Sequence, residues 1–221
     1  MKKRAIIIPV AITASLLLAL AVPFAILGIR TSLLNSNYSY LINNGTYSSE
    51  TKVTGINLVT QHVSCGYATI EMMSDFYGKK VTEDDLDKKN NGAVSTSSSD
   101  GFLKEINASI EKKEFVKESY LKHDDLLKEI HNSLTKNNPV AIEWAAKDEK
   151  EEWTLHFSLV SGVDYGNDNV TVYNPYGYIE NITINDFLDR TSFKAFENMP
   201  IFYEFGFAFG AFEKNTIFYA K

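Results

Sequence analysis

The apolar spacing of this chain changes at Pro139, and that change limits the choice of folds. Before Pro139, apolar side chains recur every three or four residues, as on one face of a helix, in two segments: Phe102, Leu103, Ile106 and Ile110, then Leu126, Leu127, Ile130 and Leu134. After it, Val140, Ile142 and Trp144 alternate with other residues, which is the period of a strand. Helices followed by strands, in a chain long enough for one domain and its core, predict an α+β fold with helices packed on an antiparallel sheet.

Turn and capping residues predict the other elements of this domain. Two short helices begin at capping patterns, Thr82 with Asp85 and Thr183 with Asp186. Strands are predicted over 153–164, 169–173 and 215–219, with a hairpin turn at Tyr165–Asp168 between the first two. The spacing does not decide between helix and strand for residues 201–212.

The N-terminus carries an uncharged apolar run from Ala5 to Ile29, preceded by the basic cluster Met1–Arg4. A helix needs about 20 residues to cross a bilayer, and this run is longer. The basic cluster predicts that the N-terminus stays inside and the bulk of the chain lies outside. We therefore expect a signal anchor with one transmembrane helix over residues 1–30, a spacer over 31–52, and the folded domain over 53–221.

A cleaved signal peptide is the alternative for this segment. Ala19-Leu20-Ala21 matches the small-residue pattern at which signal peptides are cut. In both cases the domain is exported, either tethered to the outer side of the cell membrane or secreted.

The exported part of the chain is acidic. Four of the 22 Lys and Arg lie within residues 1–30, which leaves 18 against 28 Asp and Glu in the rest. Clustered basic residues are what phosphate binding uses, so we expect no nucleic-acid partner. The single cysteine excludes an intramolecular disulfide, and with four scattered histidines it lacks zinc-ligand spacing. We expect a monomer that uses no metal and no cofactor.

That single cysteine, Cys65, stands at the start of a predicted helix. Ser64 is placed to cap this helix, which ends at Tyr77-Gly78 and is apolar on nearly every face, as in a central buried helix. The N-terminus of a helix favours negative charge, and the thiolate is the nucleophilic form of cysteine. On residue type alone a free cysteine is more often a small buried apolar group, so a reactive thiol requires a base from elsewhere in the chain.

Three of the four histidines are poorly placed to be that base. His62 precedes the helix by three residues, so its ring need not face the thiol. His123 and His131 fall at the start and on the polar side of the helix predicted over 124–136, where we expect them to be solvated.

His156 is better placed. It lies in the middle of an apolar strand, on the face of Ser158 and Gly162, two small residues that leave room beside it. After the hairpin turn, the returning strand can bring Asn174 close to His156. The carboxamide of Asn174 would then accept from the ring N–H and hold the tautomer that a Cys–His pair requires.

These segments together resemble a known family. They are Cys65-Gly66-Tyr67-Ala68 opening a helix, His156 to Asp164 on a strand, and Val170 to Pro175 after the turn. In this order they are similar to the stand-alone branch of the bacteriocin-processing cysteine peptidases. Those are papain-like proteins related to the domains that trim leader peptides at the front of bacteriocin exporters. The resemblance extends from about Gln61 to Tyr178 and implies a papain-like fold.

The resemblance also implies roles for four residues. Cys65 would be the nucleophile, His156 the general base and acid, Asn174 the orienting residue, and Gln61 the oxyanion-hole donor. Two departures from the family pattern stand out. The family usually has Asp where this chain has Asn174, and Gln61 is only four residues before Cys65, closer than in the family.

The resulting expectation is an exported, membrane-anchored cysteine peptidase that cleaves a peptide or protein substrate through a Cys-His-Asn arrangement. Two alternatives remain. One is a non-catalytic peptide-binding domain of the same fold, which the departures at Asn174 and Gln61 favour. The other is a cell-wall hydrolase, against which stand the long separation of Cys65 and His156 and the lack of a wall-binding repeat. The identity of the substrate cannot be deduced from the residues.

Overall fold

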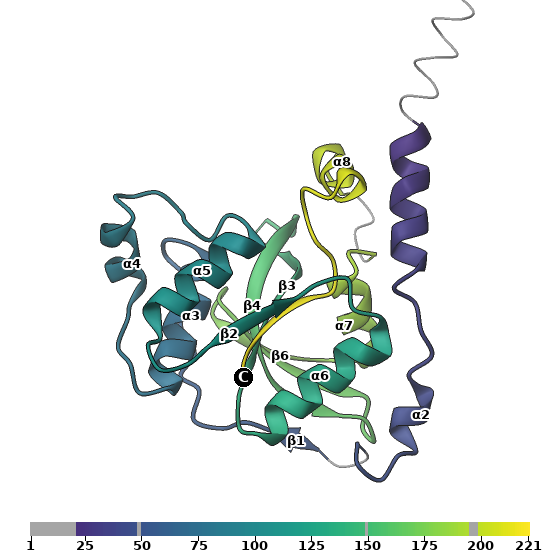
Figure 1. Cartoon of the computed structure of the whole chain (residues 1–221), viewed down its shortest axis with the longest axis horizontal. Helices are drawn as coiled ribbons and strands as arrows, with labels where there is room; N and C mark the ends of the chain where they lie inside the picture. The colour runs from purple at the N-terminus through teal and green to yellow at the C-terminus, as the bar shows by residue number, and fades with distance from the viewer. Residues whose placement is uncertain (1–20, 48–49, 149, 195–198) are drawn as a thin grey trace, which may run out of the picture.

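The computed structural model describes residues 21–47, 50–148, 150–194 and 199–221, and it has the α+β organisation that the sequence predicts (Figure 1). A helix over 21–32 comes first. The following helices are α2 (Ser39–Ile42), α3 (Cys65–Phe76), α4 (Glu83–Lys89), α5 (Ser99–Ser109), α6 (His123–Thr135), α7 (Ile184–Thr191) and α8 (Ile201–Phe209). The strands are β1 (Thr51–Lys52), β2 (Phe115–Glu118), β3 (Val140–Lys147), β4 (Trp153–Asp164), β5 (Asn169–Asn174), β6 (Tyr178–Ile182) and β7 (Thr216–Ala220).

The strands form one antiparallel sheet in the order β2-β7-β3-β4-β5-β6, and β1 adds to β4. The long hairpin of β4 and β5 has a bulge. Gly162 faces Thr171, whereas Val160 faces Val172, so one extra residue of β4 lies between these two pairs. Its turn is closed by Asp164, whose carboxylate accepts from the backbone N–H groups of Gly166 and Asn167.

Helices cover both faces of the sheet. On one face, Phe157 of β4 stacks on Phe102 of α5 with ring centres 4.4 Å apart. On the other face, Trp144 of β3 packs against Phe187 of α7. Helix α3 packs against β4 and contacts α4 and α5, and these three helices gather at one side of the molecule (Figure 1). Its buried side chains confirm that α3 is central.

Residues 31–47 pack against the domain. Leu34 and Leu41 are buried, and the backbone N–H of His123 donates to the carbonyl of Leu34. The predicted spacer therefore lies along α6 in this part rather than leading away from it. The prediction that His123 and His131 are solvated is wrong. Both are buried, because residues 31–47 cover the polar side of α6.

The predicted transmembrane run, Ala5–Ile29, lies largely outside the described residues. Its last residues belong to the helix over 21–32. Within the described ranges, no helix combines the length and apolar character that crossing a membrane requires.

Of the undecided segment 201–212, residues Ile201–Phe209 form helix α8. Helix α8 ends at Gly210, which adopts the left-handed conformation (φ 78°) that a glycine accepts without steric cost. Strands β2 and β6, at the two edges of the sheet, are elements that the spacing did not predict.

Candidate active site

Cys65 is the first residue of α3. Ser64 precedes it in an extended conformation, and its Oγ accepts a hydrogen bond from the backbone N–H of Tyr67 at 3.1 Å. This cap begins the helix at the cysteine and confirms the predicted helix start. The thiol therefore lies among backbone N–H groups that have no partner within the helix.

The surroundings of the thiol act in opposite directions on its pKa. Burial raises the pKa of Cys65 to about 11. The backbone N–H groups of Phe157, Gly66 and Cys65 itself lower it, while the carboxylate of Glu143 raises it further. Burial prevails, so the thiol is protonated at neutral pH. The three N–H groups are the donors that would stabilise negative charge at this position.

His156 is fully enclosed near the start of β4. Its Nε2 lies 2.9 Å from Oδ1 of Asn174, so the hairpin makes the contact that the sequence predicts. The ring of Tyr176 stacks on the imidazole with centres 4.2 Å apart. Burial lowers the pKa of His156 to about 3; the hydrogen bond to Asn174 raises it, and the charge of Arg190 lowers it. The imidazole is therefore neutral at neutral pH.

The contact of the thiol with β4 is through the backbone of the strand. No hydrogen bond joins Cys65 to His156 in the described part of the chain; the thiol lies instead beside the backbone N–H of Phe157, the residue that follows His156. His156 and Asn174 are thus in contact with each other, and Cys65 lies beside the next residue of β4. A thiolate–imidazolium pair is not present in this arrangement.

No contact in the described residues joins the side chain of Gln61 to the thiol, so its role as oxyanion-hole donor stays a prediction. Its backbone N–H donates to the carbonyl of Pro175 at 2.7 Å, and it lines a hollow of about 340 Å³ with Thr60 and Tyr176. Its side-chain Oε1 is buried and makes no hydrogen bond to the described residues. Gln61 is not among the residues that line the cavity at the thiol.

A separate cavity of about 320 Å³ opens at the thiol. Its lining comes from α3, the loop before α5, strands β3 and β4, and the α8 region: Ser64, Cys65, Val94, Thr96, Ser97, Glu143, Leu155, Phe157, Phe202, Tyr203 and Phe212. Glu143 is buried and accepts from the hydroxyl of Ser99 at 2.6 Å. Burial raises its pKa to about 7, so the one carboxyl group in this lining changes charge near neutral pH.

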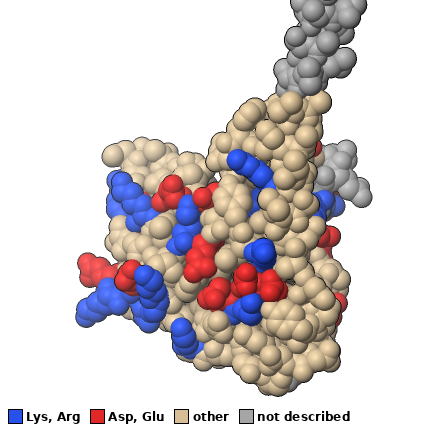
Figure 2. Space-filling model, turned by 45° about the vertical axis from the view of Figure 1, so that its right-hand side comes forward, with Lys and Arg blue, Asp and Glu red and all other residues tan. Residues whose placement is uncertain are grey.

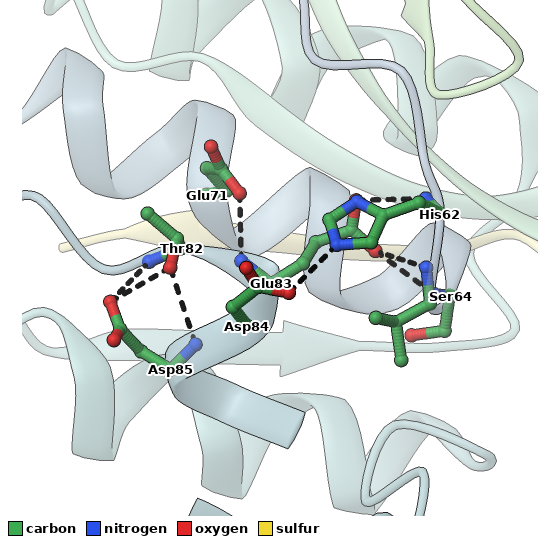
Figure 3. A network of polar contacts seen from close by, with 8 residues as sticks. His62, Ser64, Glu71, Thr82, Glu83, Asp84 and Asp85 are labelled. Atoms are coloured by element: carbon green, nitrogen blue, oxygen red, sulfur yellow. Dashed lines mark hydrogen bonds and ion pairs between the residues drawn. The ribbon is translucent and has the colours of Figure 1, made fainter. Parts of the chain in front are cut away.

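The sequence reasoning missed Glu83, which holds the loop before Cys65 (Figure 3). This buried carboxylate accepts from the backbone N–H groups of His62, Val63 and Ser64 at 2.9–3.1 Å. His62 itself turns away from the thiol, with its Nε2 2.9 Å from Asp84. The sequence does show Glu83 directly after the capping residue Thr82. Acidic residues are common in the first turn of a helix, however, so this position alone does not indicate a role at Cys65.

The described residues contain no group of three or more His, Cys, Asp or Glu side chains that could hold a metal ion. The chemical groups that the arrangement itself offers are the thiol, the imidazole, the carboxyl group of Glu143 and the backbone N–H groups around them.

Comparison with known proteins gives a family-level match. The model of the Peptidase_C39 like family matches residues 53–204, which is most of the chain. Among solved structures, the chain is similar to a double glycine motif protease from an AMS/PCAT transporter in complex with the leader peptide, with 14% identity and a TM-score of 0.48. That match covers 78% of this chain and 94% of the other. No curated protein matches the chain.

Proposed function

The chain belongs to the Peptidase_C39 like family, and from this premise we propose that it is a cysteine peptidase with Cys65 as nucleophile and His156 as base. The resemblance in the sequence pointed to the same family. The observation that carries the proposal is the hydrogen bond between His156 Nε2 and Asn174 Oδ1, because it leaves the other ring nitrogen, Nδ1, to accept a proton.

In the proposed reaction, His156 Nδ1 takes the proton of the Cys65 thiol as the sulfur attacks the scissile carbonyl. The backbone N–H groups around the sulfur stabilise the charge that develops. The imidazolium then gives its proton to the leaving amine, and a thioester to Cys65 remains. Water, deprotonated by His156, hydrolyses the thioester and releases the carboxylic acid.

Because thiol and imidazole are both neutral at rest, proton transfer has to accompany the attack rather than precede it. This distinguishes the site from one with a preformed ion pair. The stacked ring of Tyr176 covers the imidazole and shields its hydrogen bond to Asn174 from water.

The test uses the full chain in detergent and compares wild type, Cys65→Ala and His156→Ala. We expect cleavage of a peptide library by wild type only. We expect a papain-type thiol-directed inhibitor to label wild type near neutral pH and to label His156→Ala at least about tenfold more slowly. His62→Ala is the matched control, because His62 neighbours the cysteine in sequence but faces Asp84. Equal labelling of His156→Ala and wild type would contradict the pairing.

A non-catalytic peptide-binding domain is the second candidate. It is favoured by the missing bond between thiol and imidazole and by the ring of Tyr176 over His156. Binding of peptides from the same library without cleavage, together with normal thiol labelling, would support this candidate over the peptidase.

We further propose that the protein acts at the outer face of the cell membrane. The apolar run Ala5–Ile29 supports this, and so does α8, which exposes Ile201, Phe202 and Phe209 by 56–68%. The helix over 21–32 contacts α8 through Phe24 and Phe205, whose ring centres lie 6.1 Å apart.

The surface has a matching distribution of charge. In the view of Figure 2 the upper surface is largely tan, and the acidic side chains gather further down. The exposed apolar side chains of α8 suit contact with the bilayer interface. Fractionation of cells, with external protease digesting the domain in intact cells, tests this location; a domain protected from protease would contradict it.

A further inference from the structure

The side chain of Asn174 is buried, and each end of its amide has a partner of fixed polarity. Oδ1 accepts from the backbone N–H of Tyr176 at 2.9 Å. Nδ2 donates to Oε1 of Glu180, on the neighbouring strand β6, at 2.6 Å. A backbone N–H can only donate and a carboxylate can only accept, so both contacts demand the same orientation of the amide.

This orientation determines the tautomer of His156. With Oδ1 turned toward the ring, Nε2 must carry the hydrogen and donate it to Asn174. Nδ1 is then the nitrogen with a lone pair. An inverted amide would present Nδ2 to the N–H of Tyr176 and its oxygen to the carboxylate of Glu180, which places like groups against each other at both of these contacts.

Glu180 is itself held by Arg190 of α7. Arg190 Nη1 lies 2.6 Å from Oε2 and Nη2 lies 3.3 Å from Oε1 of Glu180. Nε of Arg190 donates to the carbonyl of Ala145 at 2.8 Å, and the guanidinium lies 3.5 Å from the ring centre of Trp144. Arg190 is only 5% exposed. The pair is therefore fixed on several sides and is not a mobile surface ion pair.

We propose that Glu180 and Arg190 are positioning residues that act through Asn174 to hold His156 in the tautomer with a basic Nδ1. Position 174 then requires an amide. A carboxylate there would face the carboxylate of Glu180 across the same short contact, and like charges so close repel strongly. The kinetic side of this inference rests on the proposed peptidase function, whereas the tautomer of His156 does not.

The experiment exchanges the two groups across this contact. Asn174→Asp and Glu180→Gln are compared singly and together in the full chain in detergent. In the double variant, the amide introduced at position 180 can donate to the carboxylate introduced at position 174 and can accept from Arg190. The hydrogen bond between positions 174 and 180 is then restored with donor and acceptor exchanged, and the net charge of the pair is unchanged. Three measurements are made: the ¹⁵N shifts of the His156 ring, the alkylation rate of Cys65, and the thermal unfolding midpoint.

We expect each single variant to slow alkylation about tenfold and to disturb the ring shifts, and the double variant to recover to within about threefold of wild type. The pKa of His156 should rise in the double variant, because a carboxylate then adjoins the ring. Glu118→Gln is the control: this glutamate accepts from the hydroxyl of Tyr219 on the opposite edge of the sheet, and its substitution should leave all ring shifts unchanged.

The outcomes separate this inference from the proposed function. Independent effects of the two substitutions, with no recovery in the double variant, would overturn the positioning role even if wild type cleaves peptides. Recovery of the ring shifts without cleavage of any peptide by wild type would uphold the positioning role and contradict the peptidase.

Discussion

At the scale of single residues, burial moves the pKa of Cys65 up and that of His156 down, so both groups lose their charge. Backbone N–H groups and the Asn174 carboxamide oppose these shifts without reversing them. Glu143 is the third titrating group here, and its pKa of about 7 lies between the other two. The charge beside the thiol near neutral pH is therefore that of Glu143.

Replacement of Glu143 by Gln should make the thiol more acidic. The carboxylate raises the pKa of Cys65, and Gln keeps a hydrogen-bond acceptor for Ser99 without the charge. In wild type the alkylation rate should climb with pH toward about 11. In Glu143→Gln the profile should move to lower pH, as measured by iodoacetamide labelling and mass spectrometry.

The control for this substitution is Glu105→Gln. Glu105 is also nearly buried, but it pairs with Lys89 and does not line the cavity at the thiol. Superimposable profiles for wild type and Glu143→Gln would rule out the electrostatic role of Glu143.

At the scale of elements, Glu83 couples α4 to the loop that leads into α3. Three successive backbone N–H groups of the loop donate to the carboxylate of Glu83. The backbone N–H of Glu83 in turn donates to the carboxylate of Glu71 on α3 at 2.7 Å (Figure 3). The position of Cys65 therefore depends on a residue that comes later in the chain and belongs to another helix.

Removal of this carboxylate should cost stability and reactivity together. Glu83→Ala removes the shared acceptor of three partly buried N–H groups, so the free energy of unfolding should fall by about 1–3 kcal/mol. Labelling of Cys65 should slow as the loop loosens. Denaturant unfolding and thiol labelling measure the two effects. Asp84→Ala is the matched control, since Asp84 is exposed and contacts the exposed ring of His62, and it should change neither quantity appreciably. An equal response of the two variants would mean that the loop does not depend on Glu83.

The sequence predicts elements whose signals are local. The cap at Ser64, the capping box at Thr82 and the hairpin turn before Asn169 each act within a few residues, and all three are present. The hairpin also brought Asn174 to His156 as expected.

Elements that depend on distant partners were not predictable in the same way. Strand β2 is short, and its partner β7 is the last strand of the chain, far from it in sequence. Strand β6 is an edge strand with much of its surface exposed, so it lacks an apolar alternation. Residues 201–209 are apolar or aromatic apart from Glu204 and Gly206, and such a run has no clear period to distinguish helix from strand. The contact of Glu180 with Arg190 requires α7 to pack beside β6, which no spacing reveals.

At the scale of the whole molecule, α8 has two roles in space. Phe202 and Tyr203 form part of the wall of the cavity at Cys65, while Ile201 and Phe209 are exposed, and Phe209 lines a hollow together with Arg30 of the helix over 21–32. If this exposed surface contacts the bilayer, as proposed, the cavity opens close to the membrane.

A tryptophan in place of Phe209 should report this contact. In nanodiscs that contain brominated lipids, the added fluorescence of Phe209→Trp should be quenched, because its side chain would reach the acyl region. Ile179→Trp is the matched control, at an exposed apolar position on β6, and it should not be quenched. Equal fluorescence of the two variants with and without brominated lipid would contradict a bilayer contact of α8.

The bulge in β4 has a consequence for how this hairpin can change during evolution. Beyond the bulge Leu159 faces Tyr173, and the same register puts Asn174 on the face of Ser158 and His156. If the same chain paired past Gly162 in a regular register without the bulge, Asn174 would face Leu159 and point to the opposite side of the sheet. Substitutions along the hairpin can be absorbed one side chain at a time, but a deletion of one residue between His156 and Val160, with the bulge kept, would put Phe157 opposite Asn174 and separate the amide from the imidazole. We therefore expect the length of this hairpin segment to be under stronger selection than its composition.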